Sequence, residues 1–194
     1  MILNEERVLV MYSTARLTLR AWQASDLAPF AALNQDPDVM RYFPSVLSRA
    51  QSDAMAAHIQ SKLADNGFGF WAVELTETRE FIGFVGLNRP TFDLGHQPFV
   101  EIGWRLASAH WGRGYATEAA QKALTIGFED VELPAIYAFT TESNLPSQAV
   151  MKKLGMTPAA PFTFSHPHLA ADHPLATHVL YAISKPSWQA DHAD

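Results

Sequence analysis

The sequence predicts a single domain built on a mixed α/β sheet, and three observations lead to that fold class. Its 194 residues match the size of one domain, and 48% of them are hydrophobic, so the chain can bury a sizeable core. Segments with the two-residue period of strands and segments with the period of helices follow one another in the order β-α-α-β-β-β-α-β-α-β-β. Because that order is not a strict βαβ repeat, we expect a mixed sheet.

The composition excludes several classes of protein. Cysteine is absent, which excludes disulfide scaffolds, thiolate metal sites and cysteine nucleophiles. The 14 basic and 20 acidic residues give a formal net charge of −6, which disfavours nucleic-acid binding and is compatible with a cationic substrate. The apolar run at residues 8–12 is too short for a signal peptide, and no stretch approaches the length of a membrane span. We therefore expect a soluble cytoplasmic protein that binds neither nucleic acid nor a membrane.

The first third of the chain predicts an extension, one strand and two helices. The extension covers residues 1–13, and apolar and polar residues then alternate in a strand at residues 14–20. Ser48 and Gln51 form a capping box at the start of the second helix. The two helices end at the Asp-Pro and Asn-Gly pairs of residues 36–37 and 66–67.

The rest of the chain predicts six more strands and two helices, followed by a tail at residues 189–194. The strands are expected at residues 69–75, 81–88, 99–106, 135–141, 156–164 and 177–184. The helices are expected at residues 117–128 and 144–154. Residues 14–188 are therefore expected to form the single domain.

Residues 111–119 run from a glycine-bearing loop, expected at residues 110–115, into the helix expected from residue 117. Gly112 and Gly114 let a ligand approach the backbone closely, and the helix N-terminus adds unpaired N–H donors and the positive end of the helix dipole. These features predict a phosphate or pyrophosphate site. Thr117 replaces the third glycine of the dinucleotide fingerprint, and the Gly-Lys-Ser/Thr of a Walker loop is absent. The alternative is a plain tight turn in which Thr117 or Glu118 caps the helix.

Residues 144–156 have a local structural explanation and a functional one. Asn144 is a good helix N-cap, Pro146 fits the first turn, and Gly155 fits the position after the helix. In the functional interpretation, Asn144 and Ser147 lie one turn apart and present polar groups to a cleft.

An acidic residue interrupts the apolar strand expected at residues 99–106. Glu101, Gly103 and Arg105 share one face of this strand. A carboxylate that loses its solvent acquires a raised pKa, which suits a general base. The alternative is that Glu101 faces solvent or pairs with a cation.

These three stretches, in this order and spacing, resemble the GNAT N-acetyltransferase superfamily, and within it the RimJ/RimL branch of ribosomal-protein N-terminal acetyltransferases. The resemblance runs from about residue 14 to residue 188 and includes segments at residues 16–20, 36–42, 81–87 and 178–181. It implies a splayed, mixed but mostly antiparallel sheet of six to seven strands, with about four helices on both faces. It also implies transfer of an acetyl group from acetyl-CoA to a primary amine, which is either a protein N-terminal α-amine or a small-molecule amine. A homodimer is plausible from the same resemblance.

The resemblance places coenzyme A in the splay between the strands at residues 99–106 and 135–141. The main chain of Trp104 and Leu106 would pair with the pantetheine arm, and the Asn144 side chain would hydrogen-bond to it. The loop would hold the pyrophosphate, with contributions from Trp111, Gly112, Arg113, Gly114, Tyr115, Ala116 and Thr117.

Two residues are expected to carry the catalysis. Glu101 is the expected general base, acting directly or through water. Many members of the superfamily place a tyrosine, the general acid, at the position of Met151, which cannot donate a proton. Ser147, one helical turn earlier, is the nearest hydroxyl and the expected acid. Because cysteine is absent, we expect direct attack in a ternary complex. The departure at Met151 leaves a non-catalytic coenzyme A sensor as the alternative.

Two residues between the first two helices are candidates for the acceptor site. Tyr42 and Phe43 either form a wall of the pocket that binds the amine or, with Met40, belong to the core.

Four histidines, His166, His168, His173 and His178, gather in the sequence near Asp172. One of them could line the acceptor site or act as an alternative base. A metal site is disfavoured because the interleaved prolines indicate a structured loop, so we expect no metal.

Overall fold

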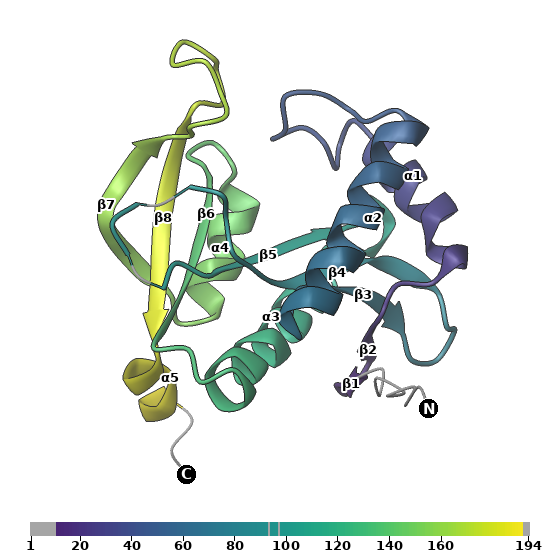
Figure 1. The fold of residues 1–194 in the computed structure, drawn as a ribbon, viewed down its shortest axis with the longest axis horizontal. Helices are drawn as coiled ribbons and strands as arrows, with labels where there is room; N and C mark the ends of the chain where they lie inside the picture. Colours follow the sequence, from purple (N-terminus) through teal and green to yellow (C-terminus); the bar gives the residue numbers. More distant parts are fainter. Residues whose placement is uncertain (1–10, 93, 97, 192–194) are drawn as a thin grey trace, which may run out of the picture.

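A computed structural model describes residues 11–92, 94–96 and 98–191, and its strands form one eight-stranded sheet (Figure 1). The strands lie in the order β1-β2-β3-β4-β5-β6-β8-β7. They are β1 (Tyr12–Ser13), β2 (Leu17–Arg20), β3 (Phe70–Leu75), β4 (Phe81–Asn88), β5 (Glu101–Leu106), β6 (Ala135–Thr141), β7 (Thr157–Ser165) and β8 (Thr177–Ser184). The helices are α1 (Leu27–Gln35), α2 (Arg49–Asn66), α3 (Tyr115–Thr125), α4 (Leu145–Lys153) and α5 (Lys185–Asp191).

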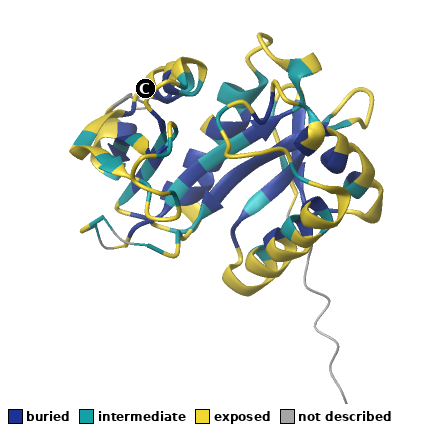
Figure 2. Ribbon diagram, turned by 90° about the horizontal axis from the view of Figure 1, so that it is seen from above, coloured by how far each residue is buried: buried dark blue, intermediate teal, exposed yellow. Residues whose placement is uncertain are grey.

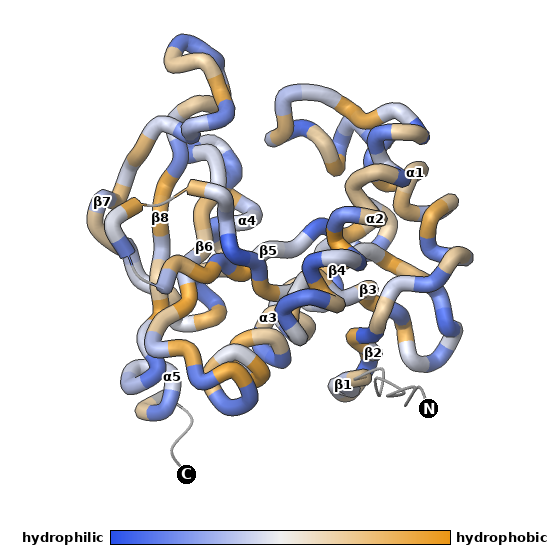
Figure 3. The backbone as a smooth tube through the Cα atoms, viewed as in Figure 1, coloured by the Kyte–Doolittle hydropathy of each residue, from blue (hydrophilic) through white to orange (hydrophobic). Residues whose placement is uncertain are grey.

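Helices cover both faces of the sheet, and each face has its own hydrophobic core. Trp71 of β3 belongs to the core that includes Ala120 of α3. The next residue, Ala72, belongs to the core that includes Phe30 of α1 and Ile59 of α2. Because successive side chains of a strand point to opposite faces, α3 lies on one face and α1 with α2 on the other. Figure 2 shows the buried strands between the exposed outer surfaces of the helices, and Figure 3 shows hydrophobic and hydrophilic residues alternating closely along the chain.

The sheet separates into two parts where β5 meets β6. Neighbouring strands are antiparallel throughout, except that β5 and β6 run parallel and pair at Glu101 and Tyr137 alone within the described residues. From that pair onward β1–β5 and β6–β8–β7 diverge (Figure 1). The predicted fold, a splayed and mostly antiparallel mixed sheet with helices on both faces, is confirmed.

The ends of the chain differ from the prediction. Tyr12 and Ser13 pair with β2, so the sheet begins inside the expected extension at residues 1–13 and has eight strands rather than six or seven. Helix α5 extends beyond the boundary expected at residue 188 and is a fifth helix in the described part of the chain. Its Trp188 side chain holds it against the domain, since it is only 7% exposed and packs on Phe128. Residues 1–10 and 192–194 of the expected extension, apolar run and tail lie outside the described residues.

Helix α3 begins two residues earlier than predicted and ends differently. Gly114 adopts the left-handed conformation, with φ of 81°, and serves as the N-cap of the helix. The last part of the expected helix is a π-helical turn, Ile126–Asp130. None of the helices in the described part of the chain is both long and apolar enough to cross a membrane.

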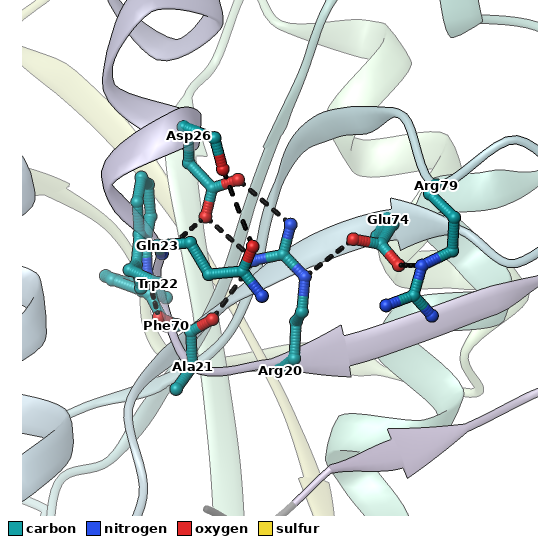
Figure 4. Close-up of polar contacts among 9 residues, drawn as sticks. Arg20, Ala21, Trp22, Gln23, Asp26, Phe70, Glu74 and Arg79 are labelled. Carbon is teal, nitrogen blue, oxygen red and sulfur yellow. Dashed lines mark hydrogen bonds and ion pairs between the residues drawn. The ribbon is translucent and has the colours of Figure 1, made fainter.

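A buried ion-pair network joins β2 and β3 to the turn before α1 (Figure 4). Arg20 donates to Asp26 at 2.8 and 2.9 Å through its two terminal nitrogens, and to Glu74 at 2.7 Å through Nε. The three side chains are at most 7% exposed, and Glu74 also lies 2.8 Å from Arg79. Each buried charge in the network therefore has a partner of opposite sign.

Candidate active site

A cavity of about 600 Å³ opens where the two parts of the sheet separate. Its wall comes from β5, β6, the N-terminal ends of α3 and α4, the loop between α1 and α2, and the segment between β7 and β8. The predicted site residues that line it are Tyr42, Phe43, Glu101, Trp104, Leu106, Trp111, Ala116, Asn144 and Ser147. The remaining predicted residues belong to the adjoining loop and the first turn of α3 and do not line it; they are Gly112, Arg113, Gly114, Tyr115 and Thr117.

Glu101 lies at the point where β5 and β6 separate, opposite Asn88 of β4. Its Oε1 accepts a hydrogen bond of 2.6 Å from Asn88 Nδ2. Burial raises the pKa of Glu101 to about 7, and the hydrogen bond from Asn88 opposes this rise. A carboxyl group with such a pKa can take up and release a proton near neutral pH. No local signal identified Asn88, because the irregular segment between β4 and β5 hides their register from sequence analysis.

In β5, the main-chain N–H and C=O groups of every second residue point into the gap between β5 and β6. Ala107 N–H donates to Ile82 of β4, whereas the Val100 carbonyl accepts from Tyr137 of β6, both at 2.9 Å. The alternation therefore turns the main-chain groups of Trp104 away from β4 and toward the gap. Leu106 faces the same way, but its carbonyl already accepts a hydrogen bond of 2.8 Å from Trp111 Nε1. Leu106 therefore has only its N–H group available to a ligand in the gap.

The loop before α3 leaves backbone donors free. Gly112 and Gly114 have φ of 74° and 81°, a conformation that favours glycine. The first N–H groups of a helix have no intrahelical acceptor. The Glu118 carboxylate does not cap them, because it binds Thr14 Oγ1 at 2.6 Å and Arg16 at 2.6 to 2.9 Å. The first turn of α3 can therefore accept an anion, and its donors fit a pyrophosphate.

Asn144 performs the structural role that its position predicts. Its Oδ1 accepts from Ser147 N–H at 3.2 Å, and its Nδ2 donates to Thr140 Oγ1 at 2.9 Å, which leaves one amide N–H for a ligand. The Ser147 hydroxyl has no hydrogen-bond partner among the described residues, and Ser147 lines the cavity. Met151, one turn later, is 1% exposed.

The loop between α1 and α2 supplies the opposite wall. Met40 is buried in the core, whereas Tyr42 and the 38% exposed Phe43 line the cavity. Arg105 lies against this loop, with its guanidinium carbon 4.1 Å from the centre of the Phe43 ring. Arg105 Nη1 donates to Asn34 Oδ1 at 2.7 Å. The alternation of this strand predicts that Arg105 shares the face of Glu101, but no local signal in the sequence indicates a role for Arg105.

His166, His168 and His178 also line the cavity, and His173 does not. The centres of the His166 and His178 rings are 4.7 Å apart. Burial lowers the pKa of His166 to about 4, helped by the neighbouring histidines, and burial lowers the pKa of His178 as well. Within the described residues, no group of three or more histidine, aspartate or glutamate side chains is arranged to hold a metal ion.

Comparison with known proteins finds acetyltransferases. A family described as an acetyltransferase (GNAT) domain matches residues 16–157. The uncharacterized N-acetyltransferase YnaD of Bacillus subtilis is 33% identical over 144 residues, which cover 74% of this chain and 81% of YnaD. The crystal structure of a GNAT-family acetyltransferase from Bacillus anthracis superposes with a TM-score of 0.75 at 26% identity, covering 91% of this chain and 99% of the other.

The likeness of fold extends to the ribosomal-protein branch. The ribosomal-protein-S5-alanine acetyltransferase of Vibrio fischeri superposes with a TM-score of 0.72, covering 92% of this chain and 98% of the other. Its identity to this chain is 18%, so this likeness concerns the fold.

Proposed function

Because this chain belongs to the GNAT acetyltransferases, we propose that it moves an acetyl group from acetyl-CoA to a primary amine by direct attack in a ternary complex. One observation carries the proposal: Glu101 has a pKa of about 7 and lines the cavity at the point where β5 and β6 separate. The acceptor is either a protein N-terminal α-amine or a small-molecule amine.

Three sets of groups fit the donor. The free amides in the first turn of α3 would hold the pyrophosphate. The main chain of Trp104 and the N–H of Leu106 would pair with the pantetheine arm as a neighbouring strand does. The remaining N–H of Asn144 would reach the same arm. Acetyl-CoA supplies the activated acyl group, and the chain supplies its position.

The chemistry requires a base and an acid. The attacking amine must be neutral, so the Glu101 carboxylate takes its proton, directly or through water. The departing sulfur needs a proton, and the Ser147 hydroxyl is a donor on the cavity wall that no described residue binds. Met151 cannot donate a proton. Without cysteine, no acetyl-cysteine enzyme intermediate can form, which favours direct attack of the amine on the thioester over a ping-pong route. Holding the two reactants together can supply roughly 7–11 kcal/mol of the barrier reduction.

The test is release of free thiol from acetyl-CoA against a panel of N-terminal peptides, polyamines, amino acids and aminoglycosides. Glu101→Gln is expected to lower kcat at least 100-fold with one amine class, and Ser147→Ala to lower it less, since water can replace a hydroxyl. Glu129→Gln, on an exposed residue of the π-helical turn, is the matched control. Full activity of Glu101→Gln would refute the assignment of the base.

A coenzyme A sensor without catalysis is the second candidate, and Met151 at the position of the usual acid is the observation that favours it. Binding of acetyl-CoA without turnover of any amine in the panel would support the sensor. Turnover of any amine would exclude it.

A further inference from the structure

Arg105 is a buried cation without a carboxylate partner. It is 9% exposed, and its Nη1 bonds to a neutral amide, Asn34. Its Nε is buried and makes no hydrogen bond, and no Asp or Glu in the described part of the chain forms an ion pair with it. Arg20, at 6% exposure, is equally buried but binds two carboxylates. A buried guanidinium without such a partner loses its hydration free energy without compensation, so a bound anion would stabilise it.

The unpaired charge faces the acceptor side of the candidate site. Arg105 lines the cavity, and its guanidinium carbon lies 4.1 Å from the centre of the Phe43 ring and 5.5 Å from that of the Phe84 ring, both of which line the cavity as well. It projects from the same face of β5 as Glu101, since the two residues are four positions apart.

Two other charged groups of the cavity wall, Arg41 and Glu101, are less suited than Arg105 to bind an anion. Arg41 pairs with Asp38 at 2.5 Å on the exposed loop. Glu101 is held by Asn88 and is partly protonated at neutral pH. Burial lowers the pKa of Arg105 to about 10, so the guanidinium keeps its charge at pH 7.

We propose that Arg105 binds a carboxylate of the acceptor, so that the substrate is an amine that also carries a carboxylate. This inference rests on the proposed function and specifies its acceptor. A planar guanidinium with uncommitted N–H groups is suited to a carboxylate. The Cα atoms of Glu101 and Arg105 are roughly 13 Å apart at the rise of a strand. That spacing favours an amine and a carboxylate separated by several bonds, as in a dipeptide or a long ω-amino acid.

The experiment compares acceptors that differ only in the carboxylate. Glycylglycine and 6-aminohexanoate are each measured beside their amides, with kcat/KM from thiol release. The wild type is expected to prefer the acids by 10-fold or more. Arg105→Met is expected to reduce the preference to about onefold while turnover of the amides remains, and Arg105→Lys to retain part of it. Arg49→Met, which removes an exposed arginine of α2, should keep the wild-type preference. The two acids distinguish a peptide acceptor from an amino-acid acceptor.

A purely structural role for Arg105 predicts different results. If the residue only anchors the loop between α1 and α2, Arg105→Met lowers turnover of acids and amides by the same factor, and the proposal fails. Equal turnover of acids and amides by the wild type also overturns it, although the proposed acetyl transfer then stands. If no amine is turned over, thermal stabilisation by 6-aminohexanoate, compared with its amide, still decides the question. We expect a rise in melting temperature with the acid that is lost in Arg105→Met, and equal curves would refute the subsite.

Discussion

Replacing Asn88 by Ala is expected to move the pH dependence of the reaction without touching the base itself. Asn88 donates a hydrogen bond of 2.6 Å to Glu101 and so stabilises its charged form. A hydrogen bond to a charged group is worth about 1.5–3 kcal/mol, and one pKa unit corresponds to 1.36 kcal/mol. Loss of the donor therefore raises the pKa of Glu101 further above its present value of about 7. Since the base acts when deprotonated, the acid limb of kcat/KM moves upward by about 1–2 pH units.

The assay is thiol release from acetyl-CoA between pH 6 and 9 with the preferred amine, for the wild type, Asn88→Ala and Glu101→Gln. Asn66→Ala, at the exposed end of α2, controls for the loss of an asparagine elsewhere. Glu101→Gln should lose the limb altogether. An acid limb that stays in place in Asn88→Ala, or one that persists in Glu101→Gln, would show that another group titrates.

Three further predictions concern stability and donor binding. The folded-state pKa of Glu101 is raised, so its contribution to stability is present below the unfolded pKa and is lost as pH rises through about 7. Chemical unfolding should therefore show that the free energy of unfolding of Glu101→Gln, relative to that of the wild type, rises by about 3 kcal/mol between pH 4 and pH 9. A difference in unfolding free energy that does not change with pH would contradict the raised pKa. Arg20→Met should cost about 3–5 kcal/mol of unfolding free energy because it leaves the buried Asp26 without a cation and Glu74 with Arg79 alone, whereas Arg49→Met should cost less than about 1 kcal/mol; similar losses would mean that the network is unimportant. Gly114→Ala places a side chain in the left-handed region at a cost of about 1–2 kcal/mol and should raise the KM for acetyl-CoA more than it lowers kcat; an unchanged KM would separate the loop from donor binding.

The central elements could be predicted from local sequence because their signals are local. The strand at Ala135–Thr141 was predicted with its observed bounds, and the capping box at Ser48 begins α2 as predicted. The two residues of β1 were missed because so short a strand carries no alternation, and it exists only through pairing with β2. Helix α5 was missed because its seven residues are shorter than two full turns of periodic pattern, and burial of Trp188 against Phe128 holds it.

The candidate site was predictable where one segment carries the signal. Glu101 was identified as an acidic residue within an apolar strand, and the loop before α3 by its two glycines. The partners of these groups were not predictable, because they come from other strands and helices. Asn88 reaches Glu101 through the register of β4 and β5, and Arg16 reaches Glu118, which lies 102 positions later in the sequence. Asn34 of α1 and Phe43 of the loop that follows α1 contact Arg105 of β5 from more than 60 positions away in the sequence.

Burial acts in opposite ways on the two charged residues that share this face of β5. It raises the pKa of Glu101 to about 7, where the group exchanges a proton under ordinary conditions. It lowers the pKa of Arg105 only to about 10, so that group stays charged. Gly103 separates them, and the Phe70 ring lies 3.1 Å from where a Cβ would be. The same buried face of β5 can thus provide both a base, Glu101, and a fixed positive charge, Arg105. This is possible because the ordinary pKa of a glutamate lies below neutral pH and that of an arginine lies far above it.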